Sequence, residues 1–239
     1  MSTRAELTIV IPAKNEARNL PSLLTSLCSQ DYPLLAHTRV FVADAGSTDG
    51  TINCALAFKD QLNVTVIPGG LPSAGRNAGA KLAETPYVLF VDADVELRDP
   101  TLLRRAMDTM KRRNLHCSTT NIWCSEGGLR DHALYLANDF VQYGASWVTP
   151  FATGMFMLFK KTEFDALKGF DERALYAEDY LLSKKISPFR FGIVPGRVFT
   201  TNRRFQKMGH LCIAKMFLKT ALNSWNSQYF LRDHEYWKA

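Results

Sequence analysis

Three short apolar runs in the first half of the chain end at acidic or polar clusters, and this arrangement sets the fold class. The runs span residues 7–11, 39–43 and 87–91, and segments with apolar residues at helical spacing separate them. Strands that alternate with helices are typical of a mostly parallel sheet. Ligands bind at the carboxyl edge of such sheets, so we expect the clusters to lie together there. They are Pro12-Ala13-Lys14-Asn15-Glu16, Asp44 to Gly50, and Asp92-Ala93-Asp94.

The same patterns predict the remaining elements. A helix is expected to open with Asp99 as its cap and Pro100 in its first turn. The pattern changes after about residue 113, but no linker interrupts the chain, so we expect one domain. Further strands are expected at residues 64–67, 118–124, 155–159 and 191–194, and further helices from residue 20, at 48–59, 76–83, 130–143 and 177–186, and from about residue 211.

Composition limits the class of protein. The net charge of +6 favours anionic partners, such as phosphates or an anionic membrane surface. No basic run is interleaved with aromatic residues, so nucleic acid is not an expected partner. The five cysteines form no CxxC pair, which disfavours a zinc site. Residues 1–6 lack the features of a signal peptide and no apolar stretch is long enough to span a membrane, so we expect a cytoplasmic protein, soluble or peripherally attached.

Asp92-Ala93-Asp94 follows a continuous apolar run, as expected after a strand that is buried on both faces. One Asp-x-Asp alone is common in turns, but two other strand-end clusters accompany this one. Mg²⁺ and Mn²⁺ take oxygen ligands and keep several waters, so one or two carboxylates suffice beside a phosphate. We therefore expect a divalent cation at Asp94, with Asp92 serving the metal or a ribose.

Seven motifs occur in a fixed order along the chain: Ile11-Pro12-Ala13-Lys14-Asn15-Glu16, Asp44 to Gly50, Gly75-Arg76-Asn77-Ala78-Gly79, Asp92-Ala93-Asp94, Thr153-Gly154-Met155-Phe156, Gly169-Phe170-Asp171-Glu172 and Glu178-Asp179. Each is loose alone, but their order resembles the family 2 glycosyltransferases with the GT-A fold. The resemblance covers about residues 7 to 210. It implies a nucleotide-binding, Rossmann-like, mostly parallel sheet flanked by helices. The single domain, 1–239, would then hold a nucleotide-sugar-binding half (about 1–113), a smaller acceptor and catalytic half (about 114–210) and a C-terminal helix (about 211–239).

The resemblance also implies roles at the donor site. Pro12, Ala13 and Glu16 would line the nucleoside pocket, and the Asp92-Ala93-Asp94 turn would hold the donor phosphates and the metal. Asp44 would accept a hydrogen bond from the base, commonly a uracil imide N–H. Arg76 would approach the base or the phosphates, since a guanidinium fork suits either; a surface charge on a helix is the alternative.

For catalysis, inverting transfer needs a carboxylate that deprotonates the acceptor hydroxyl opposite the leaving group. Similar proteins use the second acid of a pair such as Glu178-Asp179, so Asp179 is the expected base and Glu178 orients it or the acceptor. The alternative is a pair of acids that only complements a helix dipole. Arg203-Arg204 lies where related enzymes carry a basic segment over the diphosphate, and a solvated loop is the alternative.

Two features near the C-terminus stay open. His210 is expected as a metal ligand, as in some GT-A enzymes, or as a structural residue before a helix. The apolar residues of the C-terminal helix, with Lys215 and Lys219 beside them, fit either a helix that closes the core or one on a membrane surface. These apolar residues are Leu211, Ala214, Leu218, Ala221, Leu222, Trp225 and Tyr229.

The expected activity is metal-assisted, inverting transfer from a nucleotide-diphospho-sugar, with a UDP-sugar as the expected donor. The acceptor would be a hydroxyl of a glycan, a lipid-linked molecule or a small molecule, and many family members act on lipid-linked acceptors. One alternative is a sugar nucleotidyltransferase, which usually carries a Gly-rich basic loop where this chain has Pro12 to Glu16. Another is a non-catalytic sugar-nucleotide-binding protein, which would not need both acidic pairs.

Overall fold

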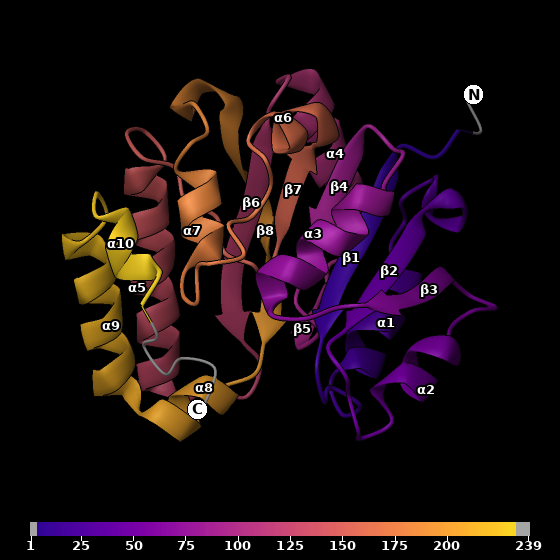
Figure 1. Cartoon of the computed structure of the whole chain (residues 1–239), viewed down its shortest axis with the longest axis horizontal. Helices are drawn as coiled ribbons and strands as arrows, with labels where there is room; N and C mark the ends of the chain where they lie inside the picture. Colours follow the sequence, from indigo (N-terminus) through magenta and orange to yellow (C-terminus); the bar gives the residue numbers. More distant parts are fainter. Residues whose placement is uncertain (1–3, 233–239) are drawn as a thin grey trace.

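The centre of the protein is an eight-stranded sheet in the order β3-β2-β1-β4-β7-β6-β8-β5, seen in a computed structural model that describes residues 4–232 (Figure 1). Strands β3, β2, β1 and β4 are parallel to one another, and β6 is parallel to β8. Strand β7 runs antiparallel to β4 and β6, and β5 runs antiparallel to β8. The expected mostly parallel α/β sheet is confirmed. The strands are β1 (Leu7–Ala13), β2 (Arg39–Asp44), β3 (Asn63–Pro68), β4 (Tyr87–Phe90), β5 (Val95–Glu96), β6 (Cys117–Cys124), β7 (Met157–Lys160) and β8 (Phe191–Thr200).

Helices cover both faces of the sheet, because its strands bury side chains on both sides. In β1, Leu7, Ile9 and Ile11 pack with leucines of α1 and α4, whereas Val10 packs on the other side with Ala80 of α3. Full burial of such a side chain stabilises the fold by about 1.5–3 kcal/mol. The helices are α1 (Leu20–Cys28), α2 (Thr51–Leu56), α3 (Pro72–Leu82), α4 (Leu102–Arg112), α5 (Leu129–Ala145), α6 (Lys161–Ala166), α7 (Glu178–Ser183), α8 (Arg203–Met208), α9 (His210–Leu222) and α10 (Ser227–Phe230), with 3-10 turns η1 (Leu35–His37) and η2 (Pro188–Arg190).

Several element boundaries differ from those expected. Strand β1 does not stop at Pro12 but continues to Ala13. The Ala13 carbonyl accepts an N–H on the β2 side, so the adjacent Pro12 faces the β4 side, where the described pairing ends at Val10. The missing N–H of Pro12 therefore leaves the β2 ladder intact. Helix α2 is shorter than expected, because residues 48–50 form a loop that ends at Gly50 with φ of +91°. Helix α3 begins at Pro72, earlier than expected, with the proline in its first turn.

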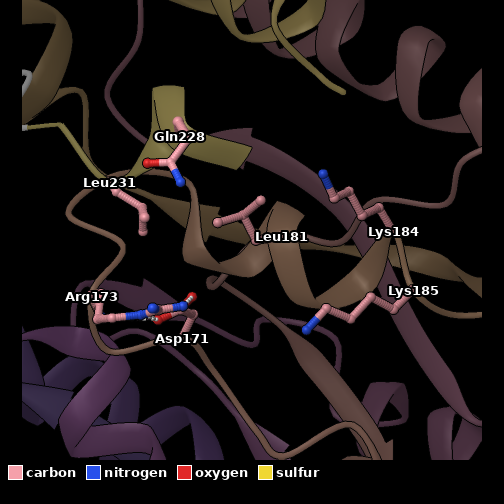
Figure 2. Close-up of a pocket in the computed structure, with 7 residues that line it drawn as sticks. All are labelled: Asp171, Arg173, Leu181, Lys184, Lys185, Gln228 and Leu231. Carbon is pink, nitrogen blue, oxygen red and sulfur yellow. Dashed lines mark hydrogen bonds and ion pairs between the residues drawn. The ribbon is translucent and has the colours of Figure 1, made fainter. Parts of the chain in front are cut away.

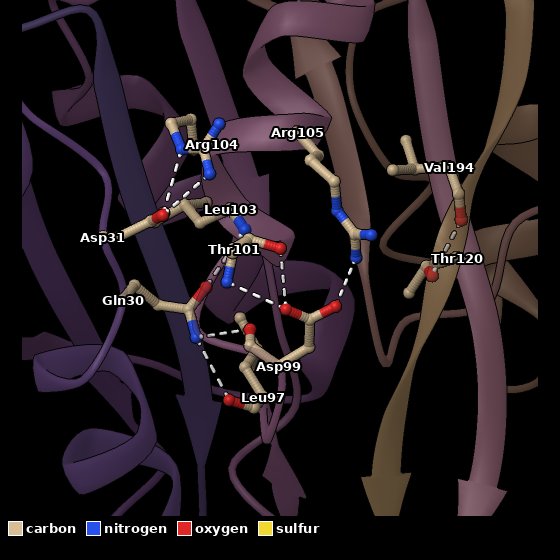
Figure 3. A network of polar contacts seen from close by, with 10 residues as sticks. All are labelled: Gln30, Asp31, Leu97, Asp99, Thr101, Leu103, Arg104, Arg105, Thr120 and Val194. Atoms are coloured by element: carbon tan, nitrogen blue, oxygen red, sulfur yellow. Dashed lines mark hydrogen bonds and ion pairs between the residues drawn. The ribbon is translucent and has the colours of Figure 1, made fainter.

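A network of polar side chains fixes the start of α4 (Figure 3). The Asp99 carboxylate accepts the Thr101 N–H at 2.9 Å and pairs with Arg105. Helix α4 begins at Leu102 with Thr101 as its cap, so the expected cap at Asp99 and the first turn at Pro100 are wrong: both residues lie before the helix. The buried amide of Gln30 donates to the carbonyls of Leu97 and Asp99 at 3.1 and 3.0 Å. Its Oε1 accepts the Leu103 N–H at 3.0 Å. Gln30 therefore ties the end of α1 to the turn before α4.

The C-terminal region contains short helices where one long helix was expected. Arg203 and Arg204 begin α8 rather than lying in a loop. Helix α9 ends at Leu222, and residues 233–239 of the expected helix lie outside the described residues. Ile213 and Phe230 are buried. A helix that closes the core is wrong for the positions that are exposed instead: Leu211, Leu218, Leu222 and Trp225.

None of the helices within residues 4–232 is long and apolar enough to cross a membrane.

Candidate active site

The loops after β1 and β2 are bound to each other at the carboxyl edge of the sheet. The Asn15 N–H donates to Ser47 Oγ at 2.8 Å, and Asn15 Oδ1 accepts the Thr48 N–H at 2.9 Å. The Glu16 N–H donates to Thr51 Oγ1 at 2.8 Å. Asn15 adopts a φ of +54°, a left-handed conformation that asparagine adopts more readily than most residues. The first two polar clusters therefore form one unit.

Asp44 ends β2 with one carboxylate oxygen bound and one unbound. Its Oδ2 accepts the N–H groups of Gly46 and Ser47, both at 3.0 Å. Its Oδ1 is buried and has no hydrogen-bond partner within residues 4–232. A buried acceptor without a donor is costly, so this oxygen is suited to receive an N–H from a ligand. A Cβ on Gly69 would lie 2.6 Å from the Ala43 carbonyl oxygen, so glycine permits the close approach of β3 here.

The apolar residues expected in the nucleoside pocket lie at the same edge. Ala13 and Ala93 are buried, and Pro12 is half-buried. A Cβ on Gly75 would lie 3.5 Å from the Pro12 Cβ, so the start of α3 packs directly on this end of β1. These residues provide a surface without charge beneath the polar groups.

Arg76 lies inside the protein, where it joins two acidic residues from different elements. Its Nη2 donates to Asp92 Oδ1 and its Nη1 to Glu178 Oε1, both at 2.6 Å. The residue is 2% exposed, and its guanidinium lies 5.3 Å from the centroid of the Phe170 ring. Burial alone would lower the pKa of Arg76, but the surrounding carboxylates outweigh burial and raise it. The alternative of a surface charge on a helix is wrong, because Arg76 is buried in a bridge between two acids. The contact of Arg76 with the base or phosphates stays a prediction.

Glycines and an asparagine allow this bridge to form. A Cβ on Gly154 would lie 2.2 Å from Arg76 Nη2, so any other residue there would collide with the guanidinium. A Cβ on Gly79 would lie 2.4 Å from a methyl carbon of Val10, which keeps α3 close to β1. Asn77 binds the backbone of Phe170 through both its Nδ2, at 2.9 Å, and its Oδ1, at 3.0 Å.

Asp94 faces a basic side chain from the far end of the chain. Its Oδ2 lies 3.5 Å from Arg203 Nη2, which also donates to Glu16 Oε1 at 2.7 Å. Burial raises the pKa of Asp94 to about 6, the charges of Asp92 and Glu16 add to the rise, and Arg203 and Arg204 oppose it. The sequence-predicted residues at 16, 94 and 203 therefore come together in space.

Asp179 is the second residue of α7 and is anchored by backbone N–H groups. Its Oδ2 accepts the Gly154 N–H at 2.8 Å, and its Oδ1 accepts the Tyr180 N–H at 2.7 Å. Burial raises the pKa of Asp179 to about 6, and the adjacent Glu178 adds to the rise. Arg76 and the two N–H groups oppose it. Each carboxylate oxygen keeps a second lone pair that can accept a proton.

The turn before α7 is strained. Ala177 has a φ of +51°, in the left-handed region that a residue with a Cβ rarely adopts. Such a conformation costs about 1–3 kcal/mol and persists only where the surrounding contacts impose it. Here it immediately precedes Glu178 and Asp179, so the backbone is held in the conformation that directs Glu178 to Arg76.

The contacts of His210 are with Asp131 and Phe205 and not with the Asp92-Ala93-Asp94 turn. Its Nε2 is 2.6 Å from Asp131 Oδ1, and its ring stacks on Phe205 at 5.3 Å between centroids. Burial would raise the pKa of Asp131, but the hydrogen bonds from His210 and the Gly128 N–H outweigh it and lower that pKa. The described residues contain no group of three or more His, Cys, Asp or Glu side chains placed to hold a metal ion. The contacts of His210 thus match the structural alternative.

Two cavities lie near Asp94 and helix α7. One of about 230 Å³ opens beside Asp94 and is also lined by Arg98. The other, of about 260 Å³, lies between α7 and α10, where Lys184, Lys185 and Leu231 line it (Figure 2). None of the residues that line the second cavity belongs to the strand-end clusters, so it is not part of the candidate site.

The sequence of this chain matches the family model "Glycosyl transferase family 2" over residues 8–167. It is 34% identical over 101 residues to the poly(ribitol-phosphate) beta-N-acetylglucosaminyltransferase TarS of Staphylococcus aureus. This match covers 41% of this chain and 18% of TarS. It is 24% identical over 214 residues to the 4,4'-diaponeurosporenoate glycosyltransferase of Staphylococcus haemolyticus. This match covers 86% of this chain and 52% of that protein. The chain thus spans between a fifth and a half of the length of these relatives.

Solved structures have the same fold. TarS residues 1–349 from Staphylococcus aureus, in complex with UDP-GlcNAc, superpose with a TM-score of 0.66 at 20% identity, over 82% of this chain and 58% of that chain. The mannosyltransferase PcManGT from Pyrobaculum calidifontis, in complex with GDP-Man and Mn²⁺, superposes with a TM-score of 0.67 at 23% identity. The match covers 90% of this chain and 64% of that chain. The GT-A fold expected from the sequence is therefore confirmed, and the chain belongs to glycosyl transferase family 2.

Proposed function

We propose that this chain transfers a sugar, with inversion, from a nucleotide-diphospho-sugar to an acceptor hydroxyl. Asp179 is the catalytic base in this proposal, and the Asp92-Ala93-Asp94 turn holds the donor diphosphate. The observation that carries the proposal is the Arg76 bridge, since its two contacts of 2.6 Å join Asp92 to the residue next to Asp179. In this proposal, the buried guanidinium of Arg76 fixes the position of the Asp92-Ala93-Asp94 turn relative to the base Asp179.

The environment of Asp179 suits a general base. A base works best when its pKa lies near the operating pH, and burial brings the pKa of Asp179 to about 6. In the proposed step, the acceptor hydroxyl gives its proton to Asp179 as its oxygen bonds to the anomeric carbon. The bond from that carbon to the diphosphate breaks, and the nucleoside diphosphate leaves. Glu178 positions Asp179 through the bridge.

A divalent cation fits the acidic turn. Asp94 is a half-buried carboxylate whose pKa is raised to about 6 by loss of hydration and by neighbouring acids, so a cation there would relieve unfavourable charge. We propose Asp94 as the metal ligand and the second oxygen of Asp92, the one not bonded to Arg76, as a further ligand. Bound Mg²⁺ or Mn²⁺ would stabilise negative charge on the diphosphate. We do not include His210 in this set, because its Nε2 is engaged with Asp131 at 2.6 Å.

UDP is the proposed nucleotide, and the support lies in Asp44. Its buried, unbound Oδ1 would accept the imide N–H of uracil, with Pro12 and Ala13 beneath the ring. TarS binds UDP-GlcNAc, whereas the mannosyltransferase of the same fold binds GDP-Man. Arg203, which already pairs with Glu16, would turn with Arg204 to the diphosphate when the donor enters.

We propose one domain over 1–239, with the donor half at about 1–113 and the acceptor half at about 114–210. The acceptor class is a glycan, a lipid-linked molecule or a small molecule, and the place of action is the cytoplasm or the cytoplasmic face of a membrane.

The test is a screen of UDP- and GDP-sugars with Mn²⁺, in which the released product is identified. Release of a nucleoside diphosphate supports glycosyl transfer, whereas pyrophosphate release indicates a nucleotidyltransferase and binding without release indicates a non-catalytic protein. Asp94→Asn should abolish the stimulation of donor binding by Mn²⁺. Tight, Mn²⁺-stimulated binding in that variant would contradict the metal assignment, and Asp60→Asn, at an exposed residue before β3, is the matched control.

A further inference from the structure

Helix α5 is polar on its buried side and apolar on its exposed side. Its buried residues are Asp131, Asp139 and Gln142. On the outside, Leu129 is 86% exposed and Phe140 is 82% exposed. A helix on the surface of a protein in water normally shows the reverse pattern, because apolar side chains gain free energy by leaving water. Helix α5 therefore presents to its surroundings the face that a helix usually buries.

Specific hydrogen bonds fix this orientation. Asp131 Oδ1 lies 2.6 Å from His210 Nε2, and Asp139 Oδ1 accepts the Ile122 N–H at 3.3 Å. The Gln142 amide donates to a backbone carbonyl at 3.1 Å. A rotation of α5 that buried its apolar face would break these bonds and leave the Ile122 N–H and that backbone carbonyl without their partners. The exposed apolar face is thus an integral part of the fold.

Helix α9 lies beside α5 (Figure 1). It buries Ile213 but also exposes large apolar side chains. Leu211 is 79% exposed and Leu222 is 61% exposed, and Trp225, just beyond the helix, is 82% exposed. We call the exposed apolar side chains of α5 and residues 147–148, together with those of α9 and Trp225, the α5–α9 surface. It holds twelve of the 17 large apolar side chains that are exposed within residues 4–232. Apolar exposure on this scale marks an interaction surface.

The charge of this region is one-sided. Residues 201–232 contain six of the 29 Lys and Arg residues and none of the 23 Asp and Glu residues, so the rest of the chain is formally neutral. Two of the six, Arg203 and Arg204, belong to the candidate donor site, and the other four are Lys207, Lys215, Lys219 and Arg232. Lys215 and Lys219 are exposed on α9, and within the described part of the chain neither takes part in an ion pair. Apolar and aromatic side chains flanked by unpaired lysines match an anionic lipid interface, where rings enter the headgroup layer and ammonium groups meet phosphates.

We propose that the α5–α9 surface docks this protein on an anionic lipid surface, without spanning it. A second copy of the chain fits less well, because a two-fold interface would place the same basic segment against itself. The inference goes beyond the proposed function and is independent of it, since α5 and α9 supply neither Asp94 nor Asp179.

The test measures sedimentation of the purified chain with vesicles of phosphatidylcholine alone and with vesicles of equal parts phosphatidylcholine and phosphatidylglycerol. We expect clear binding to the anionic vesicles, weak binding to the neutral ones, and loss of binding at high salt. Phe140→Ser on α5 and Trp225→Ser beyond α9 should each weaken binding about tenfold. The double variant Lys215→Gln/Lys219→Gln should weaken it more than tenfold and reduce the salt dependence.

Matched controls separate docking from general effects. Phe189→Ser removes an aromatic ring that is 88% exposed on η2, and Lys81→Gln removes a lysine on α3; neither should change binding. Equal binding to the two vesicle types would overturn the proposal, as would a loss with Phe189→Ser equal to that with Phe140→Ser. A stable dimer in light scattering that Phe140→Ser dissociates would assign the surface to a second copy instead. Failure of the docking test leaves the donor screen unaffected.

Discussion

Replacement of Arg76 by methionine removes the charge of the buried bridge while keeping a side chain of similar length. Asp92 and Glu178 would each lose a partner at 2.6 Å. The Glu178 side chain is 8% exposed and cannot gain full hydration, whereas that of Asp92 is 31% exposed and can recover part of it. Loss of one partner from a buried pair costs about 3–5 kcal/mol. We expect that loss for Arg76→Met, mostly through Glu178, against a total stability of about 5–15 kcal/mol for a domain.

A double-mutant cycle measured by urea unfolding isolates the bridge. Glu178→Gln removes the buried charge that Arg76→Met would leave without a partner, so the double variant should be more stable than the sum of the single effects predicts. The expected coupling is about 1–3 kcal/mol. The control is the surface pair Arg104 and Asp31, which are 2.8 Å apart with both side chains 40% exposed. For Arg104→Met with Asp31→Asn, the coupling should stay below about 1 kcal/mol.

The refuting result is plain additivity. If the losses of unfolding free energy caused by Arg76→Met and Glu178→Gln add within about 0.5 kcal/mol, the two residues act independently. The bridge would then not fix the Asp92-Ala93-Asp94 turn to helix α7. Nucleotide binding gives a second readout, because displacement of Asp92 should weaken donor binding even under conditions where the variant stays folded.

Gly154→Ala places a Cβ about 2.2 Å from Arg76 and should destabilise the protein by more than 2 kcal/mol on thermal unfolding, whereas Gly144→Ala, with open space around it, should be neutral or stabilising. Burial raises the folded pKa of Asp94 from 3.8 to about 6, so this group binds a proton more readily in the native state than in the unfolded chain. The contribution of Asp94 to stability is therefore greatest below about pH 4 and is lost as pH rises through 6. In unfolding measured across pH, Asp94→Asn should remove about 1–2 kcal/mol of that loss, seen in the difference between variant and wild type. His210→Asn should keep Mn²⁺-stimulated donor binding in calorimetry, because His210 is paired with Asp131, and loss of the stimulation would return it to the metal site.

Local patterns were enough to predict the strands and the acidic edge. Residues 7–11, 39–43 and 87–91 are apolar runs that the sheet buries, and in parallel strands their ends had to share one edge. The boundaries were less predictable because tertiary contacts set them. Pro12 stays in β1 because pairing with β2 continues past it, and residues 48–50 leave α2 to bind the loop after β1.

The links across the site were beyond reach from the sequence alone. Arg76 lies 16 residues from Asp92 and 102 from Glu178, and nothing local indicates that one guanidinium meets both. The Thr153-Gly154 motif held a signal, since a glycine required at that position implies a close neighbour, which the structure identifies as Arg76. The outward apolar face of α5 could not be predicted either, because its periodicity alone does not say which side of a helix meets the sheet.

The most direct test of Asp179 as the catalytic base is the rate of sugar transfer by the Asp179→Asn variant. Single-turnover rates and donor affinity are measured together in the presence of Mn²⁺. The amide keeps the shape of the side chain but cannot take the proton of the acceptor. We expect donor affinity to change by less than about threefold while transfer falls by about 10²–10⁴-fold. Transfer within about tenfold of the wild-type rate, at unchanged donor affinity, would contradict the assignment of Asp179 as the base facing the Asp92-Ala93-Asp94 turn.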